Sequence, residues 1–260
     1  MAQISVRRGV FFVVVLLTLA LAGLFAGMVV LMNVQPGFLG MAHFTELHHR
    51  IHDLSFAFLN ATTTVGMLAQ LRRPVRNVAS QLMALVPFAA LLLSVVLTNW
   101  SVLSPPWLLV GAAAVLATML HPAGDPLRSF SLPRADRTML ALIGIVAVPL
   151  LAFAFTNVGL QRVGAGDHAQ LGHYGYMAAL SFTVIVVGAL ASLRPDGWRL
   201  VAWVAAALPA ALGVASLVYP DVASALSLPW AIVAIAWGVV FVARAEILAR
   251  HDSATARADA

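Results

Sequence analysis

Residues 10–33 read VFFVVVLLTLALAGLFAGMVVLMN, a run of 24 residues without a charged side chain. A helix needs about 20 consecutive apolar residues to cross the hydrocarbon core of a bilayer, which is about 30 Å thick. The run therefore predicts a transmembrane helix. Arg7 and Arg8 before it, and the small residues Ala20 and Ala22 within it, also resemble a secretory signal. Because the run continues to Met32, too far for the apolar part of such a signal, we expect the helix to be retained.

The composition of the whole chain agrees with a membrane protein. Of its 260 residues, 62% are hydrophobic and only 10% are charged, and the mean hydropathy is +0.94. A soluble domain is roughly a quarter charged, so this chain cannot cover a water-facing surface, and it is too hydrophobic to be disordered. Cysteine and lysine are both absent, which excludes thiol chemistry, disulfides and lysine imines.

Seven further apolar segments follow the first, with proline and glycine at the joints between them. We therefore expect an all-α, polytopic membrane protein with eight transmembrane helices. The predicted spans are residues 10–33, 51–71, 77–99, 106–121, 138–158, 171–193, 199–219 and 228–248.

The arginines predict the orientation of these spans. Thirteen of the fifteen arginines fall on the side that holds the N-terminus, and only Arg50 and Arg162 fall on the other side. Short cytoplasmic loops of membrane proteins carry an excess of arginine and lysine. We therefore expect a protein of the inner cell membrane with both termini in the cytoplasm. The net charge of +5 then reflects topology, and nucleic acid is not expected as a partner.

Two similar segments suggest an internal duplication. Residues 66–72 read GMLAQLR and residues 188–194 read GALASLR, which are identical at five of seven positions. We expect two tandem four-helix repeats, residues 1–123 and residues 124–260, the second with a short polar C-terminal tail. Repeats with an even number of helices keep the same orientation and are related by an axis along the membrane normal.

Histidines concentrate on the predicted outer side of the membrane. They share that side with acidic residues, and His48 and His52 are four positions apart, which places them on one helical face. Asp53 and Asn60 lie further along the same helix, and we expect them to face the interior of the bundle because lipid exposure is costly. The six outer histidines are His43, His48, His49, His52, His168 and His173.

Imidazole and carboxylate groups are ligands of zinc and copper, so a metal site is one interpretation of this pattern. Haem held by histidines is another. The candidate metal ligands are His48, His52, His168, His173, Glu46 and Asp53. The candidate haem ligands are His48, His49, His52 and His173.

Residues 46–50 read ELHHR, which contains Glu-x-x-His-Arg and resembles a segment of the haem A synthases. That family also has eight helices in two four-helix halves, and the resemblance implies haem near the outer face. The family uses histidines in the outer halves of its fourth and eighth helices as well. Here the eighth predicted helix has none, and His121 lies at the inner end of the fourth. The resemblance covers five residues and a topology, and we do not assign the family from it.

Three other interpretations fit the same residues. The histidines and acids are also what hydrated helix ends contain, since polar side chains at an interface are ordinary. A small-molecule transporter with a site between the two halves is a second interpretation, and a structural or assembly subunit of a membrane complex is a third. The sequence contains no phosphate-binding glycine loop or serine nucleophile motif that would assign a reaction.

Overall fold

The computed structural model describes residues 2–35, 46–124, 134–164 and 166–258. Within these residues the chain is helical and contains no strand. The long helices are α1 (Ala2–Val34), α2 (Arg50–Gln70), α3 (Val78–Leu97), α4 (Pro105–Met119), α5 (Arg137–Val163), α7 (His173–Ser192), α8 (Trp198–Val218) and α9 (Leu228–Ala258). The short helical turns are η2 (Leu47–His49), η3 (Pro74–Arg76), η4 (Trp100–Val102) and α6 (Asp167–Gln170).

Six of the long helices are long and apolar enough to cross a membrane: α1, α3, α5, α7, α8 and α9. Each segment expected from the sequence coincides with a long helix, but α4 has only 15 residues and α2 begins with Arg50, His52 and Asp53 in its first turn. The chain is therefore an all-helical, multi-pass membrane protein. The crossing of the membrane by α2 and α4, the duplication and the orientation stay predictions.

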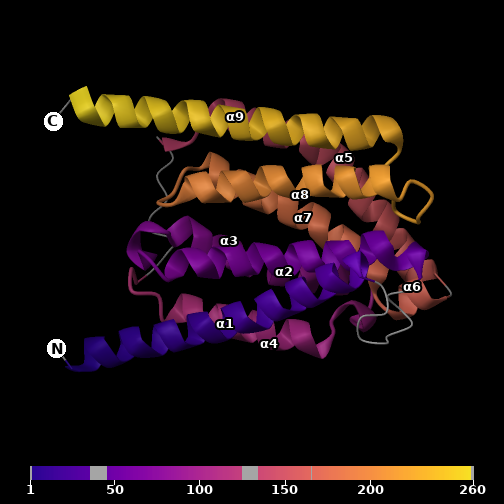
Figure 1. Ribbon diagram of the computed structural model, residues 1–260, viewed down its shortest axis with the longest axis horizontal. Helices are drawn as coiled ribbons and strands as arrows, with labels where there is room; N and C mark the ends of the chain where they lie inside the picture. Colours follow the sequence, from indigo (N-terminus) through magenta and orange to yellow (C-terminus); the bar gives the residue numbers. More distant parts are fainter. Residues whose placement is uncertain (1, 36–45, 125–133, 165, 259–260) are drawn as a thin grey trace.

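Helices α2, α3, α7 and α8 form the centre of the bundle. Helix α7 packs against α2, α3, α5 and α8, and most of its residues are buried. Helices α1 and α4 lie along one side and α5 and α9 along the other, as Figure 1 shows. The apolar side chains of these four helices are more exposed. Such exposure is unfavourable in water, but apolar side chains in contact with lipid are favourable. Both termini lie at one end of the bundle, and α6 lies at the opposite end.

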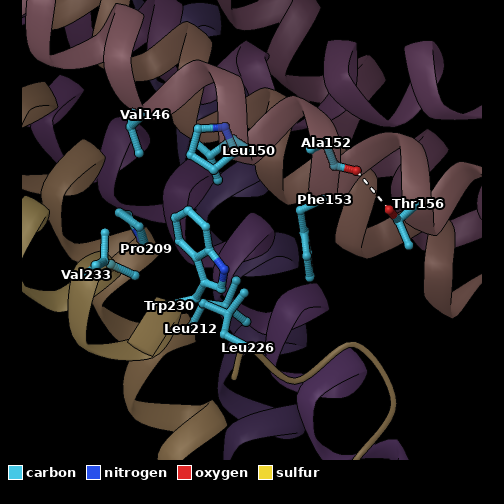
Figure 2. A pocket seen from close by; sticks show the side chains of 12 residues that line it. Val146, Leu150, Ala152, Phe153, Thr156, Pro209, Leu212, Leu226, Trp230 and Val233 are labelled. Atoms are coloured by element: carbon cyan, nitrogen blue, oxygen red, sulfur yellow. Dashed lines mark hydrogen bonds between the residues drawn. The ribbon is translucent and has the colours of Figure 1, made fainter. Parts of the chain in front are cut away.

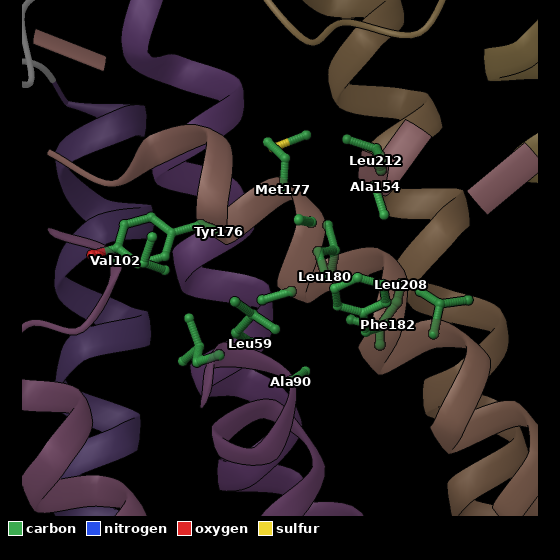
Figure 3. Packing of buried hydrophobic residues seen from close by; sticks show 14 of the residues in the cluster. Leu59, Ala90, Val102, Ala154, Tyr176, Met177, Leu180, Phe182, Leu208 and Leu212 are labelled. Atoms are coloured by element: carbon green, nitrogen blue, oxygen red, sulfur yellow. The ribbon is translucent and has the colours of Figure 1, made fainter. Parts of the chain in front are cut away.

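The largest apolar core lies where the central helices meet (Figure 3). Leu59 of α2, Ala90 of α3 and Leu180 of α7 are buried together, and Leu208 and Leu212 of α8 extend the same cluster. Packing of this kind fixes the relative positions of α2 and α7, the two helices whose first residues carry the histidines.

An apolar cavity separates α5 from α8 and α9 (Figure 2). It has a volume of about 290 Å³, and its lining includes Pro149 of α5, Pro209 of α8 and Trp230 of α9. A proline within a helix removes a hydrogen bond and bends the helix, which leaves a space between neighbours. The hydroxyl of Thr156 donates to the carbonyl oxygen of Ala152 at 3.0 Å, so the wall of the cavity offers little polarity.

At the end that holds the termini, α9 is anchored by ion pairs. Arg244 of α9 lies 2.6 Å from Asp136, and Glu246 of α9 lies 2.6 Å from Arg199. Helix α9 continues to Ala258, ten residues past the predicted end of the span. Its last residues were expected to form a short polar tail, and they continue the helix: Asp252 pairs with Arg194, and alanine favours helix.

Candidate metal centre

The beginnings of α2 and α7 lie at the end of the bundle opposite the termini (Figure 1), and the histidines lie at these two beginnings. The turn η2 leads directly into α2, and the turn α6 leads into α7. Because α2 and α7 pack against each other, their first residues become neighbours. His48, His49 and His52 come from the first junction, whereas His168 and His173 come from the second.

The junction between α6 and α7 depends on Gly172. Its φ of +74° is left-handed, a conformation that side chains other than glycine rarely adopt. A Cβ atom at this position would lie 2.6 Å from the carbonyl oxygen of Ser101. Glycine therefore allows the chain to turn sharply against η4, and the turn directs His168 and His173 toward the same point.

The imidazoles of the five histidines touch one another. His168 lies in the middle, and its ring centroid is 4.5–5.4 Å from those of the other four. The Nδ1 atoms of His49 and His173 are 3.1 Å apart. His52 and His173 stack with their ring planes 14° apart. Ring nitrogens from two separate parts of the chain therefore converge on a small volume.

Four of the five rings are removed from solvent. His49, His52 and His173 are at most 4% exposed and His168 is 9% exposed, whereas half of the His48 side chain is accessible. The Nε2 atom of His52 lies 3.3 Å from Ser224 Oγ, but its Nδ1 atom has no hydrogen-bond partner within the described part of the chain. Buried polar atoms without a partner are uncommon and call for an explanation.

Two exposed carboxylates border the rings on the solvent side. Asp167 Oδ2 lies 3.1 Å from His49 Nε2 and 3.3 Å from His48 Nε2, and Glu46 Oε2 lies 3.2 Å from His49 Nε2. Hydrogen bonds from His168 and His48 hold the pKa of Asp167 below its ordinary range. This carboxylate is therefore ionised at neutral pH and supplies negative charge at the rim.

Two sets of side chains place potential ligand atoms within 4.8 Å of one another. The outer set consists of His48, His49, Asp167 and His168, and the inner set consists of His52, His168 and His173. The outer set offers the three nitrogens and one oxygen of a four-coordinate site. The inner set offers three nitrogens, the number that leaves one position open on a tetrahedral ion.

A cavity of about 390 Å³ adjoins the inner set. Its lining includes His52, Asp53, His173 and Tyr176, together with apolar side chains of α1 and α2 such as Phe56. Asp53 and Asn60 are buried, as expected for polar residues on a helix inside the bundle. Asp53 faces this cavity and belongs to neither set of ligand atoms.

All six predicted metal ligands lie at this end of α2 and α7. Four of them, His48, His52, His168 and His173, belong to the two sets. Glu46 is a direct neighbour of His49, and Asp53 faces the adjoining cavity. His49, expected only as a haem ligand, belongs to the outer set. Asp167 was not among the predicted ligands, although its position directly before His168 was a usable indication. His43 lies outside the described residues.

Two other polar residues that drew attention in the sequence have structural partners. Arg50 is buried, and its guanidinium donates to the carbonyl oxygen of Asn33 at 2.8 Å and to Asn33 Oδ1 at 3.1 Å. It satisfies the end of α1, where carbonyl groups lack partners within the helix. His121 lies at the opposite end of the bundle, with its Nε2 atom 3.2 Å from Gln70 Oε1.

Comparison of the chain with models of protein families finds no match, and comparisons with curated proteins and with solved structures find none either. The similarity to the haem A synthases therefore remains a local one at residues 46–50.

Proposed function

We propose that this membrane protein binds a transition-metal ion, Zn²⁺ or Cu²⁺, through the histidines at the beginnings of α2 and α7. The observation that carries the proposal is the convergence of ligand atoms from His48, His49, Asp167 and His168 within 4.8 Å. Ligands around a tetrahedral zinc ion with Zn–N bonds of about 2.0 Å lie roughly 3.3 Å apart, so small side-chain movements complete the site.

The burial of the rings supports this proposal. Imidazoles gain nothing from being packed together away from water unless their nitrogens are satisfied, because a buried polar atom without a partner costs free energy. The Nδ1 atom of His52 is such an atom within the described part of the chain, and His52 belongs to the inner set. A metal ion would use the nitrogen lone pairs that face one another.

The spacing of the rings favours an ion over a haem. A haem with two axial histidines needs the rings on opposite faces of a porphyrin, with the macrocycle between them. Here the centroids of His49 and His168 are 4.5 Å apart, and those of His52 and His168 are 4.6 Å apart, at ring-to-ring contact. Mixed imidazole and carboxylate ligation suits zinc and copper, whereas calcium and magnesium prefer oxygen ligands.

Metal analysis of the purified protein tests the proposal. We expect protein that has been stripped with a chelator and reloaded with Zn²⁺ or Cu²⁺ to retain metal when measured by mass spectrometry. His168→Ala should lower the affinity by about 100-fold or more, since even residues that only support metal ligands contribute 10–100-fold. His251→Ala, an exposed histidine at the opposite end of the bundle, is the matched control and should bind like the wild type.

Two further variants identify the set that holds the ion. His48→Ala removes a ligand of the outer set alone, and His52→Ala removes one of the inner set alone. If one substitution lowers the metal affinity strongly and the other weakly, the ion is assigned to the set that contains the first residue. Absence of retained metal in the wild type would contradict the proposal. A Soret absorbance band in the wild type that is lost in the same variants would show that the histidines bind a haem and not a single ion.

A further inference from the structure

The arginines at the end that holds the termini differ in their partners. Four arginines of the second half are paired with carboxylates at distances of 3.5 Å or less. These pairs neutralise much of the charge on that side of the bundle. They are Arg134 with Asp196, Arg194 with Asp252, Arg199 with Glu246, and Arg244 with Asp136.

The arginines of the first half have no such partners. Among the described residues, none of Arg7, Arg8, Arg72, Arg73 and Arg76 forms an ion pair with a carboxylate. Arg7 donates to the carbonyl oxygen of Met119 at 3.0 Å, and the guanidinium of Arg8 lies 6.0 Å from the centroid of the Phe12 ring. Within the described part of the chain, no carboxylate therefore compensates the positive charge around α1, α4 and η3.

A cavity of about 380 Å³ opens among these uncompensated arginines. Arg7 and Arg8 of α1 form one wall, Pro74 and Val75 of η3 form another, and the residues that follow α4 close it. No acidic side chain belongs to the described residues of its lining. Two guanidinium groups on one wall, with no carboxylate beside them among residues 2–35, 46–124, 134–164 and 166–258, are what an anion requires.

His121 also lines this cavity, but it adds no charge. It is buried, and burial lowers its pKa to about 4, so the ring is neutral at pH 7. Its Nδ1 atom accepts a hydrogen bond from the backbone N–H of Ala123 at 3.2 Å, and its Nε2 atom faces Gln70. The positive potential of the cavity comes from the arginines.

We propose that this cavity binds the phosphate group of an anionic phospholipid. Guanidinium groups bind phosphate oxygens with paired hydrogen bonds, and basic pockets between membrane helices accept lipid head groups. The surroundings of the cavity also favour a lipid over a free anion, because Val10 and Met119, close in sequence to the lining residues Arg8 and Leu120, are exposed for contact with acyl chains. The site lies at the opposite end of the bundle from the metal centre and does not depend on it.

Native mass spectrometry with defined lipids tests this site. We expect purified wild-type protein to bind phosphatidylglycerol in preference to phosphatidylcholine. Arg8→Gln should weaken phosphatidylglycerol binding about tenfold and leave phosphatidylcholine binding unchanged. Arg8 is preferred to Arg7 because Arg7 also holds α4 through Met119. The matched control is Arg250→Gln, which removes one exposed charge from α9 at the same end of the protein.

A second variant guards against a folding defect in the first. Val75 is 54% exposed, so Val75→Glu should fold normally while it places a carboxylate in the cavity wall, and it too should lose phosphatidylglycerol. Equal losses in Arg250→Gln, or no preference of the wild type for the anionic lipid, would overturn the proposal. Binding of inorganic phosphate without binding of phosphatidylglycerol would overturn the lipid assignment and identify a soluble phosphate as the ligand.

Discussion

At the scale of single residues, the carboxylate of Asp167 contacts the imidazoles of three histidines. Its Oδ2 atom faces His48 and His49, and its Oδ1 atom lies 3.0 Å from His168 Nδ1. A carboxylate that accepts a hydrogen bond from a ligand histidine fixes the orientation of the ring and increases its basicity. Asp167 can serve either as a ligand of the outer set or as the residue that orients His168 toward the inner set.

Gly172 allows a prediction about the same site. Gly172→Ala combines an unfavourable positive φ with a contact of 2.6 Å to the carbonyl oxygen of Ser101. We expect a lower thermal unfolding temperature, with a loss of about 1–3 kcal/mol, and weaker metal binding because His168 and His173 are displaced. Thermal unfolding and metal titration measure the two effects.

Gly124 provides the control for that substitution. Its φ is +80°, but a Cβ atom there has nothing within 4 Å. Gly124→Ala therefore introduces similar backbone strain without the steric contact and should leave metal binding unchanged. Equal metal binding by Gly172→Ala and the wild type would show that this turn does not position the histidines.

The sequence predicted that the histidines gather at one side of the membrane, but it did not predict which of their side chains meet. The spacing of His48 and His52 indicates a shared helical face from periodicity alone. The meeting of these residues with His168 and His173 depends on the packing of α2 against α7, which periodicity does not specify. The same limit explains Asp53, which lines the neighbouring cavity together with His52 but belongs to neither set of ligand atoms.

At the scale of elements, Asp136 joins three helices. Its side chain accepts a hydrogen bond from the N–H of Met139 at 2.8 Å, which caps the beginning of α5, and it binds Arg244 of α9. Its backbone N–H donates to the carbonyl oxygen of Ser192 at the end of α7. Burial disfavours the charged carboxylate, but the hydrogen bonds from Arg244 and Met139 outweigh burial and lower the pKa of Asp136.

Asp136→Asn should therefore destabilise the protein in a pH-dependent way. Asparagine still caps the helix, but the charged partner of Arg244 is lost, for which we expect about 1–2 kcal/mol at pH 7. Because the pKa is lowered in the folded state, the contribution is present above the ordinary aspartate range and disappears as the pH falls through the folded pKa. Thermal unfolding of both proteins from pH 7 to pH 3 measures this difference.

Asp196→Asn is the comparison for that experiment. Asp196 pairs with Arg134 at 3.5 Å, and both side chains are about half exposed, so the pair should contribute little. A stability difference for Asp136→Asn that stayed constant across the pH range would argue against an ionised Asp136 as its source.

Helix positions were the most predictable elements because an apolar run of sufficient length has few alternatives in a membrane. The short elements were not predictable. The α6 turn exists because Gly166 and Gly172 both adopt positive φ, and the end of α9 is extended by a contact between Asp252 and Arg194, residues that are far apart in sequence.

At the scale of the whole molecule, charge is divided between the two ends of the bundle. The end with the termini carries most of the described arginines, and the other end carries the histidine cluster. Arginine excess predicts that the first end faces the cytoplasm. Because the chain has no cysteine, a single introduced thiol reports its own location without a background.

Val163→Cys and Val75→Cys test the orientation. Val163 ends α5 near the histidine cluster and is 85% exposed, and Val75 lies in η3 at the arginine-rich end and is 54% exposed. We expect a membrane-impermeant thiol reagent to label Val163→Cys in intact cells and Val75→Cys only after permeabilisation. The opposite pattern would place the termini outside, and labelling of both in intact cells would contradict a sealed, single orientation.

Helices α1 and α9 are longer than a bilayer requires. They contain 33 and 31 residues, which at 1.5 Å per residue gives roughly 45–50 Å, against a hydrocarbon core of about 30 Å. Both termini lie at the same end of the bundle, so the excess projects there (Figure 1). A fluorescent domain fused directly after α9 would thus be connected to the bundle by a rigid helix. Its distance from the membrane surface would be set by the length of that helix and not by a flexible linker.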